Sequence, residues 1–223
     1  MTPYPDPMLY YDIHTHQPAI HPEDIAIVSV DLRKPFVPDT LRYSVGVHPW
    51  YADIDHWEET LRLYGKVREY ANLPTVTAIG ETGLDKITAK TTKEFQFQRM
   101  FFIGHARLAE MEKKIIIIHC VKAWDELLSV HKALKPSTPW IVHGFRGKKS
   151  MANRLLDAGL YLSFGLHYSI DALKAAWENH RLLAETDDNQ INIRDVYHRI
   201  ASDLNISENE LGEEIEDFCR IYV

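Results

Sequence analysis

Cysteine is scarce in this chain of 223 residues. The two cysteines, Cys120 and Cys219, are too few for a disulfide framework, which excludes small disulfide-stapled secreted folds and favours a reducing compartment. Long apolar runs are also lacking, since the longest strongly apolar run without a charge, 115–118, is far too short to span a bilayer. The first residues, MTPYPDPMLYY, lack the basic-then-apolar pattern of a secretory signal. We therefore expect a cytoplasmic protein that does not bind membranes.

Basic residues are fewer than acidic ones, with 25 lysines and arginines against 32 aspartates and glutamates. The formal net charge is therefore −7. This balance argues against a general electrostatic attraction to nucleic acids or anionic membranes. It does not exclude a local basic site, and bound divalent cations would reverse the charge where they sit. Gly/Ser linkers, charge blocks and short repeats are also absent from the sequence, so we expect residues 1–223 to form a single domain, with a monomer favoured.

What the chain does contain is a series of short apolar runs, several of them continuous and rich in β-branched residues, as strands buried on both faces should be. The runs cover 9–13, 25–30, 43–47, 76–79, 115–118, 140–142, 161–164 and 182–184. Apolar residues at three- and four-residue steps predict helices over 54–72, 92–113, 124–134, 149–158 and 170–178. Eight strands alternating with helices predict an α/β fold, a (β/α)8 TIM-type barrel, with an open doubly wound sheet as the alternative.

Two connections do not fit an ideal barrel. Pro18 and Pro22 interrupt the segment between the first two runs, and Pro35 and Pro38 interrupt the next segment. Because proline breaks helix interiors, we expect a barrel trimmed of the helices after its first two strands.

The C-terminal segment is predicted to be helical. Ser207 and Glu210 form a capping-box pattern, and apolar residues follow on one helical face. We expect the barrel to occupy 1–190 and the helices of 191–223 to pack on it.

Histidines and carboxylates follow the apolar runs. Side chains at i and i+2 of a strand point the same way, so DIHTH after the first run aims His14 and His16 at one point. The later runs are followed by GVHP, IGETGLD, IIHC, VHGF and AETD. In a TIM-type barrel the carboxyl ends of the strands meet on one face, where active sites are built. We therefore expect one cluster, with each member at a strand end: His14, His16, Glu81, His119, His143 and Asp187.

Each of these residues alone has a plainer interpretation. His119 fits a hydrogen-bonded core histidine, Glu81 a turn cap, Asp187 a helix N-cap and His143 a loop contact. Together these readings require a coincidence at every strand end, so we favour a metal site. Histidine and carboxylate ligands without a cysteine pair suit Zn, Mn, Fe or Mg. Because a catalytic zinc keeps one coordination position open, these residues are too many for one ion and predict two metals bridged by Glu81.

The motifs DIHTH, GVHP, AIGETGLD, IIHC, VHGF and ETD, in this order, resemble the TatD family of metal-dependent hydrolases. Members are trimmed amidohydrolase-like barrels, and many are deoxyribonucleases. The resemblance runs from residue 12 to residue 187. It implies that one metal is held by His14, His16, Glu81 and Asp187, and the second by Glu81, His119 and His143. It also implies that Glu81 and Asp187 are the catalytic carboxylates, with Asp187 orienting or deprotonating the attacking water.

Further positions match the family near the metals. The resemblance implies that His48 and Asp85 support the ligands or contact the substrate. Asp12 and Glu185 are expected to lie behind the ligands and to support the strand ends.

The sequence also departs from the family pattern. Val121 stands where the family often has an arginine that reaches a phosphate, Lys86 where a tyrosine is usual, and Asp188-Asn189 where Ser-Pro or Ala-Pro is usual. The ligands are kept while the positions that contact the substrate have changed.

Three local features bear on a phosphate-containing substrate. FRGKKS, 145–150, places Arg146 just after His143 at a predicted helix start, which favours a phosphate, although a solvated basic loop explains it equally well. Lys86 could replace a lost positive charge. Trp50 and Tyr51 could stack on a base or simply pack their loop.

The leading prediction is a two-metal phosphodiesterase that acts on DNA from an end of a single strand, using two divalent ions of Zn, Mn or Mg. One alternative is a hydrolase of a small ester, amide, lactone or phosphate on the same dinuclear site, which the absence of an arginine at Val121 favours. Another is a non-catalytic barrel that binds metal, nucleotide or a partner protein. The presence of every ligand argues against this last alternative.

Overall fold

The computed structural model describes residues 8–223, so most of the segment on which the missing signal pattern was judged lies outside the described residues. The strands are β1 (Tyr11–Thr15), β2 (Ile25–Ser29), β3 (Arg42–Val45), β4 (Val76–Asp85), β5 (Ile115–Val121), β6 (Trp140–Val142), β7 (Tyr161–Phe164) and β8 (Leu182–Ala184). The helices are η1 (Pro49–Tyr51, a 3-10 turn), α1 (Trp57–Tyr70), α2 (Thr92–Glu112), α3 (Trp124–Leu134), α4 (Lys149–Asp157), α5 (Ile170–Glu178), α6 (Ile193–Leu204) and α7 (Glu208–Tyr222). Within this range no helix is both long and apolar enough to cross a membrane.

The strands form one parallel sheet in chain order, from β1 to β8. The sheet closes where the segment after β8 meets β1. The Asp187 N–H donates to the His14 carbonyl at 3.0 Å, and the Asp187 carbonyl accepts the His16 N–H at 3.0 Å. At the same junction the Asp12 carboxylate accepts the Thr186 N–H at 3.1 Å and the Thr186 hydroxyl at 2.6 Å. This closure confirms the TIM-type barrel and excludes the open doubly wound sheet.

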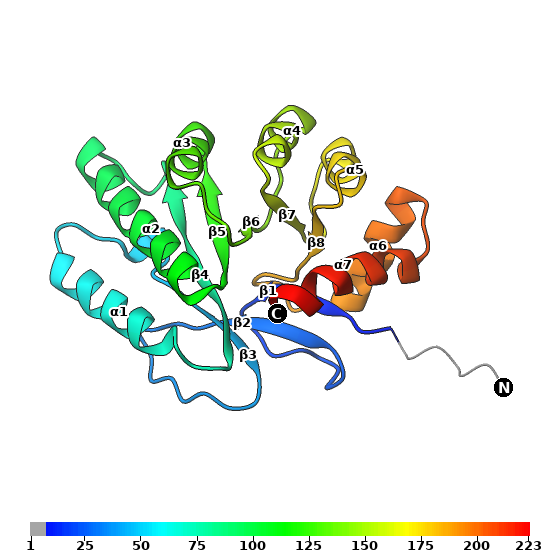
Figure 1. Ribbon diagram of the computed structural model, residues 1–223, viewed down its shortest axis with the longest axis horizontal. Helices are drawn as coiled ribbons and strands as arrows, with labels where there is room; N and C mark the ends of the chain where they lie inside the picture. Colours follow the sequence, from blue (N-terminus) through cyan, green and yellow to red (C-terminus); the bar gives the residue numbers. More distant parts are fainter. Residues whose placement is uncertain (1–7) are drawn as a thin grey trace.

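Among the described residues, helices follow the strands only from β3 onward (Figure 1). Helices α1 to α6 follow strands β3 to β8 in turn and fan around one side of the barrel, whereas β2 and β3 lie on the side without a covering helix. The segments 16–24 and 30–41 contain no helix, as their prolines predicted. The trimmed first side of the barrel is therefore confirmed.

Helix α7 begins with the predicted capping box. The Ser207 hydroxyl accepts the Glu210 N–H at 3.2 Å, and the Glu210 carboxylate accepts the Ser207 N–H at 2.8 Å. Leu211, Ile215 and Phe218 are buried against the barrel.

Helix α7 lies at the end of the barrel where the strands begin. Phe218 packs against Tyr161 of β7, with ring centroids 4.6 Å apart. Nε of Arg42, the first residue of β3, donates to the carbonyl oxygen of Val223 at 3.3 Å. Helix α7 therefore does not cover the opposite end of the barrel, where the strands finish and the polar cluster lies. Helix α6 packs on β8 as the last helix of the barrel, so α7 alone extends beyond it.

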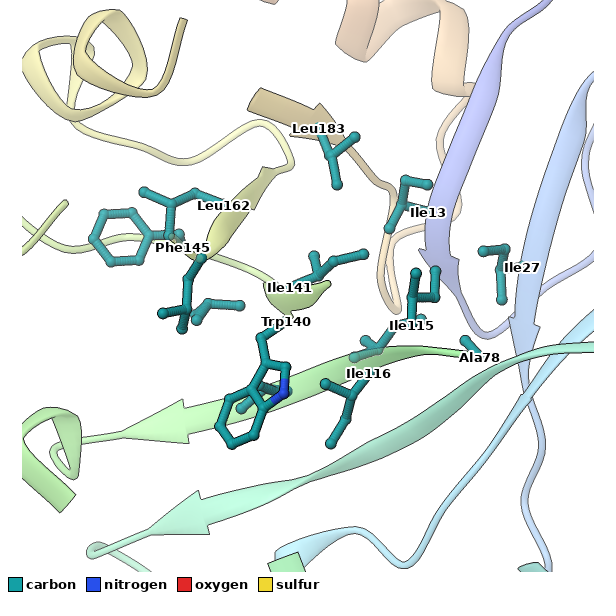
Figure 2. Packing of buried hydrophobic residues seen from close by; sticks show 14 of the residues in the cluster. Ile13, Ile27, Ala78, Ile115, Ile116, Trp140, Ile141, Phe145, Leu162 and Leu183 are labelled. Carbon is teal, nitrogen blue, oxygen red and sulfur yellow. The ribbon is translucent and has the colours of Figure 1, made fainter. Parts of the chain in front are cut away.

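The core combines side chains from strands far apart in the sequence (Figure 2). Ile13, Ile27, Ile141, Leu162 and Leu183 belong to different strands and are fully or almost fully buried. The four isoleucines of 115–118 are each at most 1% exposed, so β5 is buried on both faces. Burying each of these side chains stabilises the fold by about 1.5–3 kcal/mol relative to an exposed position.

Strands β4 and β5 are longer than predicted. They continue to pair beyond the barrel wall, with Thr82 opposite Ile118 and Asp85 opposite Val121, after a register irregularity between Ile79 and Thr82. Glu81 and His119 therefore lie inside strands, as His14 does in β1, and the prediction that every site residue stands at a strand end was wrong. Polar residues ended the apolar runs in the sequence, but they do not interrupt the backbone ladder, which requires no apolar side chain.

Candidate metal centre

Glu81 stands at the centre of the polar cluster, with a carboxylate that is 7% exposed. Its Oε1 lies 2.8 Å from Nε2 of His143 and 3.0 Å from Nδ1 of His119. Nε2 of His48 also lies 3.0 Å from this oxygen. Three imidazoles from different strands and loops thus meet at one carboxylate oxygen.

The second oxygen of Glu81 faces another group. Oε2 lies 3.5 Å from Nε2 of His14 and 3.7 Å from Nε2 of His16. Oδ1 of Asp187 lies 3.6 and 3.7 Å from the same two nitrogens. Glu81 therefore separates two groups of potential ligands, with one group on each of its oxygens.

The backbone of Asp187 is held in an unusual conformation. Its φ of 56° lies in the left-handed region, which aspartate tolerates better than most residues. Its N–H and carbonyl both bond to β1, which fixes this conformation as the sheet closes. Strained backbone of this kind is concentrated at functional sites, where the surrounding structure supports it.

Glycines allow the strands around Glu81 to approach one another. Gly83 has a φ of 153°, and a Cβ there would lie 1.9 Å from the carbonyl oxygen of His119. A Cβ on Gly80 would lie 2.6 Å from the Ile117 carbonyl oxygen. The GETG sequence is thus required by the close pairing of β4 with β5, and it sets the position of the carboxylate between them.

Two of the imidazoles have a second carboxylate behind them. Nε2 of His119 lies 3.3 Å from Oδ2 of Asp85, and Nδ1 of His143 lies 3.5 Å from Oε1 of Glu185. Asp85 is 3% exposed and also accepts the indole N–H of Trp50 at 2.8 Å. Outer carboxylates of this kind orient metal-binding imidazoles and raise their basicity. The structure thus places Asp85 behind His119 and Glu185 behind His143.

Two buried polar residues of α2 hold the loops of the site, and the sequence reasoning missed both. Nε2 of His105 accepts the Val47 N–H at 3.0 Å, next to His48. Gln98 accepts the Asp85 N–H at 2.9 Å and donates to the Pro49 carbonyl at 3.2 Å. The available signal was a pair of polar residues at i and i+7 on the apolar face of the predicted helix.

Two predicted substrate residues stand outside the group of side chains that meet at Glu81. The Lys86 ammonium lies 5.0 Å from the ring centroid of Phe95 on α2. Arg146 is exposed in the segment between β6 and α4. Among residues 8–223, no hydrogen bond or ion pair joins either side chain to Glu81 or Asp187.

The charges of the cluster are strongly coupled. Burial raises the pKa of Glu81, but His143, His119 and His14 outweigh burial and hold this pKa well below its usual range. Burial also raises the pKa of Asp187, and His14 and His143 overcome it to give a pKa of about 2. Both carboxylates are therefore ionised at neutral pH.

The donor set fits divalent metal ions. Both ring nitrogens of the fully buried His14 lack a hydrogen-bond partner among residues 8–223. Burial lowers the pKa of His14, and Asp187 and Glu81 raise it to about 9, so a positive charge is favoured at this place. Ionised carboxylates facing buried imidazoles form the nitrogen and oxygen ligand set of zinc and related ions. Three groups bring potential ligand atoms within 4.8 Å of one another: His14, His143 and Asp187; His14, His16 and Glu81; and His48, Glu81 and His119.

This arrangement agrees with the family to which the sequence is matched. The family described as TatD related DNase matches residues 18–219. The chain belongs to the TatD family. An uncharacterised metal-dependent hydrolase of Buchnera aphidicola is 30% identical over 158 residues, which are 67% of this chain and 59% of that protein. The uncharacterised metal-dependent hydrolase YabD of Bacillus subtilis is 32% identical over 156 residues, with the same coverage of 67% and 59%.

The chain thus spans about three fifths of the length of these two TatD relatives. Among solved structures, the TatD homologue YJJV of Escherichia coli aligns with a TM-score of 0.70 at 20% identity and covers 93% of this chain and 95% of its own. A hydrolase of the TatD family from Entamoeba histolytica aligns with a TM-score of 0.68 at 20% identity, covering 92% and 95%. These structures share the fold, and the relatives' names agree with the histidine and carboxylate cluster found here.

Proposed function

We propose that this TatD-family protein is a phosphodiesterase that holds two divalent cations and acts on DNA from an end of a single strand. The observation that carries the proposal is the division of ligands by Glu81, with His119 and His143 on Oε1 and with His14 and His16 on Oε2. Imidazoles beside each of the two carboxylate oxygens suit two ions, one at each oxygen, better than a single ion. Two bound Zn, Mn or Mg ions would supply charge for the phosphoryl oxygens and lower the pKa of a water molecule.

The chain offers ligands for each position. His14, His16, Glu81 and Asp187 would hold the first ion. Glu81, His119 and His143 would hold the second. His48 is a further candidate at the second position, because its Nε2 is as close to Oε1 of Glu81 as Nδ1 of His119 is.

Asp187 is the best-placed base. Its side chain is 23% exposed, so it can reach a water molecule at the open end of the barrel. Its fixed backbone aims Oδ1 at the first ligand group, and its low pKa keeps it ionised. It would orient the attacking water and accept its proton.

The rim of the site offers a surface for a nucleic-acid base. Trp50 is 58% exposed, and its indole N–H is fixed by Asp85. Its ring centroid lies 4.7 Å from that of His48 and 6.0 Å from that of His119. An exposed, oriented aromatic ring beside the ligands can stack on the terminal base of a strand, a contact that is independent of sequence.

A second candidate function is the hydrolysis of a small ester, amide or phosphate at the same centre. Val121, the last residue of β5, favours it, because no cation stands there to reach a polymer phosphate. Substrate profiling separates the two functions.

The test is incubation of the protein with end-labelled single-stranded DNA under Mg, Mn or Zn, together with a count of bound metal. We expect metal-dependent shortening from one end. Asp187→Asn should lower the rate by about 10²–10⁴-fold, the usual contribution of a positioned acid or base. The matched control is Asp217→Asn on α7, where the side chain is 79% exposed and distant from the mouth. DNA left intact by the metal-loaded protein would overturn DNA as the substrate, and full activity in Asp187→Asn would overturn the role of Asp187.

A further inference from the structure

A pocket of about 290 Å³ opens beside the metal centre, between the segment that joins β2 to β3 and the segment that follows β3. Its lining includes His16, His48 and Glu81 of the cluster and Asp31, Arg33 and Lys34 of the segment between β2 and β3. Ligand pockets commonly measure about 300–1,000 Å³, so this space suits one nucleotide-sized group and not a duplex. We call it the Arg33 pocket.

The wall that carries Arg33 is firmly anchored. The Leu32 side chain is 4% exposed, and its carbonyl accepts the Lys66 ammonium of α1 at 2.6 Å. Nε and Nη2 of Arg33 bond the two oxygens of Asp31 at 2.8 and 2.9 Å. The Arg33 guanidinium carbon also lies 3.9 Å from the ring centroid of Tyr51. A wall held in place before binding loses little conformational freedom when a ligand arrives.

The wall has a surplus of positive charge. Arg33 and Lys34 share the single carboxylate of Asp31, which leaves one net positive charge. Their side chains are 48% and 77% exposed. Nη1 of Arg33 makes no hydrogen bond within residues 8–223, so one edge of the guanidinium remains available. Guanidinium N–H groups match the geometry of phosphate oxygens, and local positive charge is conspicuous in a chain of net charge −7.

We propose that the Arg33 pocket binds a terminal phosphate of the substrate, next to the phosphodiester placed at the metal centre. The proposal rests on the phosphodiesterase function and narrows it to strand ends that carry a phosphomonoester. Arg33 and Lys34 then supply the positive charge that Val121 does not. A 5′-phosphate and a 3′-phosphate share this chemistry, and substrate comparison distinguishes them.

The test compares short oligonucleotides with a 5′-phosphate, a 3′-phosphate or neither. We expect kcat/KM to favour one phosphorylated end by about tenfold, the size of a charge-assisted hydrogen bond. Arg33→Gln should abolish this preference through KM while leaving the turnover of bis(4-nitrophenyl) phosphate unchanged. Arg220→Gln is the matched control, because Arg220 forms a similar pair with Glu216 on α7. Equal rates for all three substrates, or a preference that survives in Arg33→Gln, would overturn the proposal.

A second variant and a binding measurement distinguish failure of the pocket proposal from failure of the phosphodiesterase proposal. Lys34→Gln leaves the Arg33–Asp31 fork intact and should lower the preference in the same direction. Calorimetric binding of the three oligonucleotides to metal-loaded Asp187→Asn protein does not depend on turnover. Binding that prefers a terminal phosphate and depends on Arg33, without cleavage by the parent protein, supports the pocket and rejects the phosphodiesterase function. Cleavage without such a preference in binding supports the function and rejects the pocket.

Discussion

At the scale of a single residue, Glu185 lies behind the candidate ligand His143. It is 1% exposed, its Oε1 accepts the Gly144 N–H at 2.7 Å, and the same oxygen lies 3.5 Å from Nδ1 of His143. This carboxylate faces Nδ1 of His143, while Nε2 of the same ring faces Glu81. The motif predicted a supporting role for Glu185, whereas its contact with His143 depends on how β8 lies beside the segment after β6.

Glu185→Gln should weaken metal binding. The amide can still accept the Gly144 N–H, but it removes the negative charge beside His143. Loss of an outer-shell partner usually costs about 10–100-fold in metal affinity. Metal competition titrations should show this rise in Kd, and Glu59→Gln on α1, 50% exposed, is the control. An unchanged Kd would contradict the supporting role.

At the scale of elements, the pairing of β4 with β5 depends on Gly83. Gly83→Ala would place a methyl group 1.9 Å from the His119 carbonyl oxygen at a φ of 153°. We expect a loss of more than about 2 kcal/mol in the free energy of unfolding, together with displacement of Glu81 and His119. Urea denaturation and metal content measure the two effects.

Gly65→Ala is the contrasting variant. Gly65 lies inside α1, and a Cβ there meets nothing within 4 Å. The higher helix propensity of alanine should stabilise this variant by about 0.5–1 kcal/mol. Equal effects at Gly65 and Gly83 would mean that the strand pairing does not require a glycine.

Helix α2 makes the stability dependent on pH through His105. Burial lowers the pKa of His105 to about 4, despite the opposing bond to the Phe101 carbonyl. Above its ordinary value of 6.5 both the folded and the unfolded states hold a neutral ring. Below that value the unfolded chain binds a proton that the folded chain does not, until the pH reaches about 4. The free energy of unfolding therefore falls through this window, by up to about 3 kcal/mol.

Urea denaturation at pH 7.5 and pH 5.0 tests this linkage. The His105 contribution should be about 2 kcal/mol smaller at pH 5.0 than at pH 7.5. His105→Gln removes the titrating group, so the variant should lose less stability than the parent protein between these two pH values. Identical losses in both proteins would show that His105 does not carry the linkage.

At the scale of the whole molecule, we expect metal binding and folding to be coupled, because the candidate ligands from β1, β4, β5 and the segments after β6 and β8 meet only in the closed barrel. At a free metal concentration of 100 Kd, binding should stabilise the fold by about 2.7 kcal/mol. In a protein of this size the corresponding rise in Tm is on the order of 5–10 °C. Calorimetry with and without chelator measures it, and Glu81→Gln should shrink the shift. A Tm unaffected by the chelator in a metal-loaded protein would contradict the coupling.

The sequence by itself determined the order of strands and helices and the identity of most candidate ligands. Apolar periodicity predicts which face of each element is buried, and the prolines predict that no helix follows β1 or β2. These are local properties, so the ranges predicted for helices such as 124–134 and 170–178 agree with α3 and α5.

Only the tertiary structure decided which side chains touch. It placed Glu81 inside β4 with a different ligand group on each oxygen, and it brought His48 to the same oxygen as His119. It also buried Gln98 and His105 beneath the loops of the site and set Arg33 beside the cluster. These contacts depend on strand register, barrel closure and left-handed backbone at Asp187. All three features depend on contacts between residues that are distant along the chain, so no local sequence pattern predicts them.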